Sequence, residues 1–154
     1  MIDPPQIVYT QPQLTAAIHV TVAREDIAMV MDPGVRELLD AISAQGLSIT
    51  GPMFTHHLRR PTDSFDFEIC FPVASLVAPV GRVTAGRIPA STVARTVYHG
   101  GYEGLGGAWG EFEAWIVGHG HTPDGDFWES YLVGPESGVA PAAWRTELNR
   151  PLVR

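Results

Sequence analysis

The sequence contains no lysine, one cysteine and no long apolar run, and each shortage excludes a class of protein. Ten arginines against 17 acids give a net charge of −7, which opposes binding to a nucleic-acid backbone. Cys70 alone cannot form an internal disulfide. No segment approaches the roughly 20 apolar residues that a membrane helix requires. Because residues 1–5 show no signal-peptide pattern either, we expect a cytoplasmic protein that binds neither nucleic acid nor membrane.

The composition is that of a globular chain. Hydrophobic residues make up 45% of the 154 residues and charged residues 18%, a balance that disordered segments do not have. A chain of this length forms one compact domain, or two half-domains that share a core. We expect a single domain over residues 1–154.

An internal repeat is the most informative pattern in the chain. Three segments of the first half match segments of the second half in order: 38–46 with 112–120, 53–58 with 127–132, and 65–73 with 144–152. A duplicated unit that cannot bury its own apolar face stacks on its copy, and a ligand site between copies is a natural consequence. The copies differ there, since Thr55 and His57 correspond to Glu129 and Tyr131.

The clearest helix signal follows Asp32. Val35, Leu38, Leu39 and Ile42 recur at the spacing of one helix face. Asp32 followed by Pro33 predicts the start of this helix, and Gly46 predicts its end.

Each repeat is predicted to have the order strand, helix, strand, strand. In the first repeat, the strands cover 15–22, 53–58 and 65–73, and alternation places Phe65, Phe67, Ile69 and Phe71 under the helix. In the second, strands cover 93–98, 127–133 and 144–148, and the helix presents Trp109, Phe112, Trp115 and Ile116. We therefore expect repeat one at about 6–73, a crossover at 74–90 with brief pairing over 80–83, and repeat two at about 91–152.

The motifs of the second half resemble the GyrI-like small-molecule-binding domain family, which also forms the effector domain of AraC-type and multidrug-responsive regulators. The resemblance rests on residues 97–105 (VYHGGYEGL), 109–115, 128–132 (WESYL) and 147–152 (ELNRPL), and it covers about residues 6 to 152. It implies an α+β fold of two pseudo-twofold βαββ units, with a joint antiparallel sheet, two main helices and a ligand cleft. With no room for a DNA-binding domain beside the match, we expect a stand-alone form.

The resemblance also implies a function. In the family's multidrug binders a buried Glu on a strand meets the positive charge of lipophilic cations, and Glu129 and Tyr131 match that position and its companion. We therefore expect a binder of bulky, lipophilic, often cationic aromatic compounds. Two alternatives stay open: a hydrolase that opens the cyclopropane of DNA-alkylating natural products, with Glu129 and Tyr131 as catalytic residues, and an inhibitor acting on a protein partner such as gyrase.

The residues themselves support this site and also allow plainer interpretations. Glu129 shares a strand face with aromatic residues, which is costly unless the acid is protonated, paired or meets a cation. A solvent-facing edge, or a bond to a structural arginine such as Arg145, is the plainer interpretation of Glu129. The candidate ligand-binding residues are Glu129, Tyr131, Phe127, Tyr98, Trp109, His57, Glu68 and Trp144.

No cofactor is expected. The pairs His56-His57 and His119-Gly120-His121 lack further ligands at the spacing of a recognised metal site, so we expect no metal. The identity of a protein partner cannot be derived from the sequence.

Overall fold

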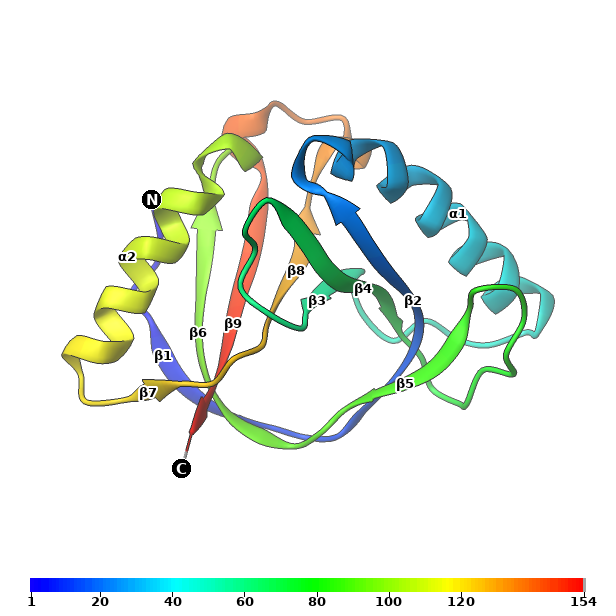
Figure 1. Cartoon of the computed structure of the whole chain (residues 1–154), viewed down its shortest axis with the longest axis horizontal. Helices are drawn as coiled ribbons and strands as arrows, with labels where there is room; N and C mark the ends of the chain where they lie inside the picture. Colours follow the sequence, from blue (N-terminus) through cyan, green and yellow to red (C-terminus); the bar gives the residue numbers. More distant parts are fainter. Residues whose placement is uncertain (154) are drawn as a thin grey trace. The chain divides into compact units, whose positions relative to one another are not determined.

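The computed structural model describes residues 1–153, which divide into two compact units (Figure 1). One unit covers Gln11–Ala90, and the other joins Met1–Thr10 to the chain from Ser91 onward. Each combines antiparallel strands with one main helix, so the predicted α+β class with two main helices is confirmed.

The unit of residues 11–90 is a four-stranded antiparallel sheet with one helix. Its elements are β2 (Gln13–Ala23), α1 (Ile27–Ala44), β3 (Phe54–His57), β4 (Ser64–Pro72) and β5 (Thr84–Ile88). The strand order is β3-β4-β2-β5. Leu38 and Ile42 of α1 share a core with Phe67 and Ile69 of β4, all at most 2% exposed. The prediction that alternate residues of this strand pack under the helix is confirmed.

The predicted start of α1 was wrong. The helix begins at Ile27, after a single 3-10 turn at Arg24–Asp26, so Pro33 lies inside it. Proline removes one backbone donor, but the turns before it are retained because Ile27, Val30 and Met31 pack against the core. The predicted end is confirmed, since Gly46 has the positive φ of 65° typical of a residue that follows a helix.

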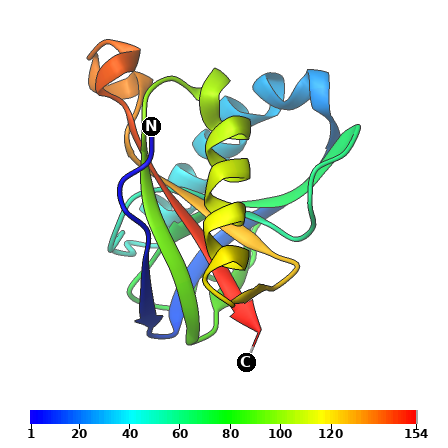
Figure 2. The same ribbon diagram turned by 90° about the vertical axis from the view of Figure 1, so that its left-hand side faces the viewer.

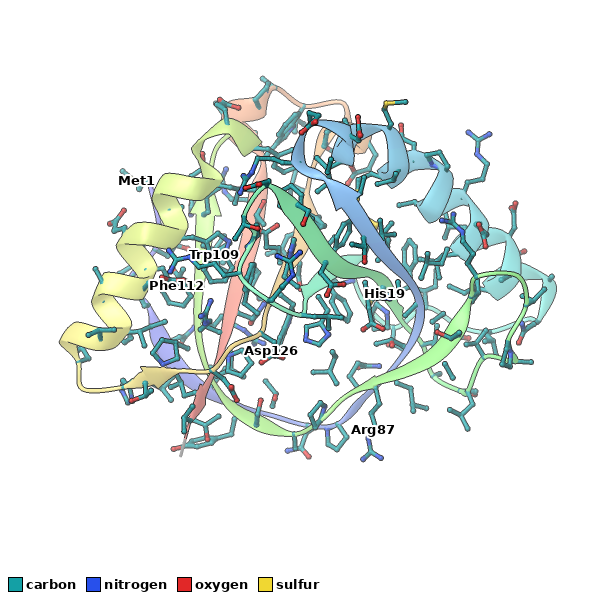
Figure 3. All side chains as sticks on the ribbon, viewed as in Figure 1. Met1, His19, Arg87, Trp109, Phe112 and Asp126 are labelled. Carbon is teal, nitrogen blue, oxygen red and sulfur yellow. The ribbon has the colours of Figure 1, made fainter. Side chains whose placement is uncertain are left out.

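The second unit has the same plan. It contains β1 (Gln6–Thr10), β6 (Ser91–His99), α2 (Leu105–Gly118), β7 (Thr122–Pro123), β8 (Phe127–Val133) and β9 (Arg145–Val153). The strand order is β1-β6-β9-β8, and β7 pairs with the end of β9. Figure 2 shows α2 in front of β6 and β9, and Figure 3 labels Trp109 and Phe112 on α2.

The apolar face of α2 packs on this sheet as predicted. Phe112 and Ile116 are fully buried together with Leu148 of β9, and Trp109 and Trp115 are partly buried at the edge of the same core. Burying one such side chain contributes about 1.5–3 kcal/mol to stability.

The strand register supports the duplication. In the first unit β3 pairs with β4, which in turn pairs with β2, and in the second unit β8 pairs with β9, which in turn pairs with β6. The matching positions have matching partners: Thr55 is opposite Ile69 as Glu129 is opposite Leu148, and His57 is opposite Phe67 as Tyr131 is opposite Thr146.

Two edge strands were missed by the sequence analysis. β5 lies in the segment predicted as a crossover, where only the brief pairing of Val80 with Val83 was foreseen and is confirmed. β1 directly precedes β2 in the chain but pairs with β6, so residues 6–10 belong with the second half. The division into repeats at 73 and 91 stays a prediction. No helix within residues 1–153 is long and apolar enough to cross a membrane.

Candidate functional site

Strand β8 places Glu129 on the sheet face that carries α2. Glu129 lies opposite Leu148, whose side chain is buried in the core beneath α2. Paired residues of antiparallel strands point to the same face, and every second residue does so along one strand. Phe127, Glu129 and Tyr131 therefore face α2, in agreement with the predicted alternation.

Both carboxylate oxygens of Glu129 accept a hydrogen bond. The Trp109 indole Nε1–H donates to Oε2 at 2.7 Å, and the Tyr131 hydroxyl donates to Oε1 at 2.9 Å. Glu129 is only 9% exposed. Burial raises the pKa of its carboxyl above 4.5, because the charged form loses hydration, while the two hydrogen bonds act in the opposite direction. The fold thus holds a buried acid in a fixed orientation.

Two specific plainer interpretations of Glu129, a solvent-facing edge and a salt bridge to Arg145, can be tested in the structure. The low exposure excludes a solvent-facing edge. Arg145 does not pair with it either: its Nη1 donates to the backbone carbonyls of Ala142 and Trp144, at 3.2 and 2.8 Å.

Aromatic rings lie on both sides of the acid along β8. On one side the Trp109 ring lies 4.6 Å from Phe127, centroid to centroid. On the other side the Tyr102 ring lies 5.9 Å from Tyr131. We call Glu129, Trp109, Phe127, Tyr131 and Tyr102 the Glu129 cluster. Ring faces beside a carboxylate are the surroundings in which proteins hold organic cations.

Phe127 and Trp144 make further contacts around the cluster. Phe127 is 5% exposed, and the guanidinium of Arg150, a residue of β9, lies 5.5 Å from the centre of the Phe127 ring. The Trp144 ring lies 4.9 Å from that of Tyr102, and its Nε1–H donates to the Val139 carbonyl at 3.1 Å.

Tyr98 orders the glycine-rich loop that carries Tyr102. Its hydroxyl donates to the Gly101 carbonyl at 2.7 Å, and its side chain is 6% exposed. Gly104 lies so close to this hydroxyl that a methyl group there would overlap it. Tyr98 therefore contacts the loop through its hydroxyl, and its predicted contact with a ligand stays a prediction.

His57 and Glu68 belong to the unit of residues 11–90. His57 is 5% exposed, stacks 5.3 Å from Phe67 and shares a 3.2 Å hydrogen bond between its Nε2 and Thr55 Oγ1. Burial, with a smaller contribution from neighbouring His56, lowers its pKa to about 4. His57 is therefore neutral near pH 7. Glu68 lies opposite His19 and His56, with 3.4 Å between its Oε1 and His56 Nδ1.

The duplication thus produces two versions of one arrangement. In each unit the residues at the third and fifth positions of the matched segments 53–58 and 127–132 are hydrogen bonded, as Thr55 with His57 and as Glu129 with Tyr131. The first pair is neutral, whereas the second contains an acid. The six other candidates, Glu129, Tyr131, Phe127, Tyr98, Trp109 and Trp144, all lie in the second unit, and their role in ligand binding stays a prediction.

Sequence analysis missed Tyr102. Tyr102 lies in the glycine-rich motif, where its only signal is that of a lone aromatic between Gly101 and Gly104. Burial is the largest cause that raises the pKa of Tyr102, and the negative charges of Glu136 and Glu129 raise it further.

Within residues 1–153, no group of three His, Cys, Asp or Glu side chains is arranged to hold a metal ion.

The fold and this site define a small-molecule-binding domain. The pattern of the GyrI-like small molecule binding domain family matches residues 3–152, and the chain belongs to this family. The match covers almost the whole chain, so the predicted family is confirmed.

Solved structures share the fold at low sequence identity. The EcmrR C-terminal domain superposes with a TM-score of 0.87 at 21% identity, covering 98% of both chains. SAV2435 bound to tetraphenylphosphonium has a TM-score of 0.71 at 13% identity, covering 98% of this chain and 94% of that one. A hydrolase from Listeria innocua has a TM-score of 0.73 at 12% identity, covering 97% and 91%.

The chain spans 57% of the EcmrR chain in its DNA complex, where the TM-score is 0.86 at 20% identity over 98% of this chain. No curated protein matches the sequence.

Proposed function

We propose that this protein binds bulky, lipophilic, aromatic cations at the Glu129 cluster. The observation that carries the proposal is a 9%-exposed carboxylate whose two oxygens are oriented by Trp109 and Tyr131, with further rings on both sides. A buried carboxylate is costly to ionise, and a cation beside it recovers part of that cost.

The affinity is expected to come from two sources. Apolar ligand surface contributes roughly 25 cal/mol for each Å² removed from water. A cation over an aromatic face contributes about 0.5–2 kcal/mol per ring. Stacking accepts many ring systems, whereas one carboxylate selects only the sign of the charge. This division favours a site that is selective for charge and tolerant of shape.

Two further observations support a cationic ligand. The unit that holds Glu129, counted over residues 1–10 and 91–154, has nine acids and four arginines, which makes it the more acidic of the two. In addition, a structural neighbour, SAV2435, was solved with the lipophilic cation tetraphenylphosphonium.

The decisive experiment compares a cationic with a neutral dye on a charge-removing variant. Glu129→Gln should weaken rhodamine 6G by about 30-fold, which corresponds to about 2 kcal/mol, the loss typical of a hydrogen bond to a charged group. Nile red, a neutral dye, should lose little. Fluorescence anisotropy titrations measure both. Glu111→Gln is the matched control, because Glu111 lies on the exposed side of α2 and carries the same charge.

Tyr131→Ala separates stacking from charge. It removes a ring of the cluster and one donor to Glu129, so both dyes should bind more weakly. Equal losses for the two dyes in Glu129→Gln would remove the carboxylate from charge selection. Unchanged titrations in Tyr131→Ala would place Tyr131 outside the ligand site.

The raised pKa of Glu129 favours hydrolysis as a second candidate, because a buried carboxylate is a stronger base once ionised. Glu129 would take one proton from water as the water oxygen bonds to a cyclopropane carbon. The electrons of the broken carbon–carbon bond would pass to a conjugated carbonyl, whose oxygen becomes a phenolate. Tyr131 would then protonate this oxygen. Mass spectrometry of a cyclopropane-bearing alkylator incubated with the protein would detect the added water. Saturable binding without this product favours the first function.

A further inference from the structure

Glu136 is held at the tip of a short ordered turn beside the Glu129 cluster. Pro135–Ser137 form one 3-10 turn, in which Ser137 N–H donates to the Gly134 carbonyl at 3.1 Å. Gly138 N–H donates to the Pro135 carbonyl at 3.2 Å, and Gly138 has a φ of 78° that favours glycine. The backbone on both sides of Glu136 is therefore fixed, although its side chain is exposed.

The Glu136 carboxylate and the Tyr102 hydroxyl converge on one point. A methyl group built on Gly134 would lie 2.8 Å from Glu136 Oε2 and 2.9 Å from the Tyr102 hydroxyl oxygen. Gly134 is buried, and only its hydrogen fits between the two groups. The Tyr102 ring in turn lies 4.9 Å from Trp144 and 5.9 Å from Tyr131.

Both polar groups can still form hydrogen bonds. Among residues 1–153, neither the Tyr102 hydroxyl nor the Glu136 carboxylate takes part in a hydrogen bond or an ion pair. The Glu136 carboxylate, the Tyr102 phenol and the Trp144 ring together form one small group. That combination binds alkylammonium groups through charge and ring faces together.

We infer that Tyr102, Trp144 and Glu136 form a second cation subsite, so that the protein prefers elongated aromatic dications over comparable monocations. This inference rests on the function proposed for the Glu129 cluster. One charge of the ligand lies at buried Glu129, and the other lies at exposed Glu136 beside the Tyr102 hydroxyl. Tyr102 responds to both carboxylates, since each helps to raise its pKa.

Ethidium and propidium provide a matched pair of probes. They share one phenanthridinium ring system, and propidium adds a quaternary ammonium on a short alkyl arm. The wild-type protein should bind propidium about threefold to tenfold more tightly than ethidium, the range of one exposed charge contact with a ring contribution. Fluorescence titration at fixed ionic strength measures both affinities.

The variants assign that preference to its residues. Glu136→Gln should abolish the preference for propidium while ethidium binding stays within about twofold. Glu111→Gln, with the same change in net charge on α2, should keep the preference. Tyr102→Leu should reduce it, because the ring face is lost.

Each outcome has one interpretation. Equal affinity of the wild type for the two dyes, or a propidium preference that survives Glu136→Gln, would overturn the second subsite and leave the Glu129 cluster intact. Ethidium binding that is insensitive to Glu129→Gln would instead refute the proposed function and, with it, this inference.

Discussion

Replacing Glu129 by Gln is expected to change how the stability of the ligand-free protein depends on pH. Glutamine keeps the shape of the side chain and can satisfy both neighbours. Its amide oxygen accepts from Trp109 Nε1–H, and its amide N–H donates to the Tyr131 hydroxyl oxygen. The variant should therefore fold like the wild type but without a buried ionisable acid.

The magnitude follows from linkage. In the unfolded chain Glu129 titrates near 4.5, whereas in the folded protein burial raises its pKa. Below 4.5 both states are protonated, and the group does not affect the difference in stability. Above 4.5 the unfolded state releases its proton first, so the wild type loses stability relative to the variant by up to about 1.4 kcal/mol per pH unit. The loss stops once the folded carboxyl has ionised.

The assay is urea unfolding followed by tryptophan fluorescence, repeated from about pH 4 to pH 8. All other titrating groups are common to both proteins and cancel in the difference of the two free energies of unfolding. The difference should favour the variant increasingly with pH and then level off, and the pH at which it levels off gives the folded pKa of Glu129. A difference that is constant with pH, or one that favours the wild type as pH rises, would refute the argument from burial.

Two further predictions concern the framework around the site. His57→Gln should make the free energy of unfolding depend less on pH under acidic conditions. Because burial lowers the pKa of His57 from 6.5 to about 4, the wild type should lose about 3 kcal/mol of stability as pH falls across that interval. Urea unfolding measures this loss, and an equal loss in the variant would show that His57 is accessible to protons. Gly104→Ala should lower the free energy of unfolding by about 1–3 kcal/mol, because the added methyl group overlaps the Tyr98 hydroxyl. Gly110→Ala is the control: Gly110 lies in α2 with open space around it, so this change should raise the free energy of unfolding by about 1 kcal/mol. Equal shifts of the two variants in thermal unfolding would mean that the loop accommodates the methyl group without cost.

The local elements were largely predictable because their signals are local. The apolar periodicity of 35–42 and 109–116 gave both helices, and alternation gave the faces of β4 and β8. The start of α1 was misjudged because Asp32 and Pro33 form a strong local start signal. Packing of Ile27, Val30 and Met31 against the core outweighs that signal, and such packing involves residues distant in sequence.

The edge strands illustrate the same limit. β5 contains Gly86 and two exposed positions before it, so its own pattern does not indicate a strand. It pairs with β2, and Gly86 lies where a methyl group would be 2.5 Å from Thr15 Oγ1. The requirement for glycine therefore comes from a close approach between strands and not from a turn.

By itself, the sequence determined the duplicated strand–helix–strand–strand order and the position of an acid among aromatics on β8, because hydrophobic periodicity and repeat matching depend only on residue order. Only the tertiary structure decided that both oxygens of Glu129 accept hydrogen bonds, from Trp109 and Tyr131. It also decided that the Tyr102 hydroxyl and the Glu136 carboxylate both lie close to Gly134. Those contacts join residues of different strands, helices and loops, and distances between such elements are set by packing, which no local pattern encodes.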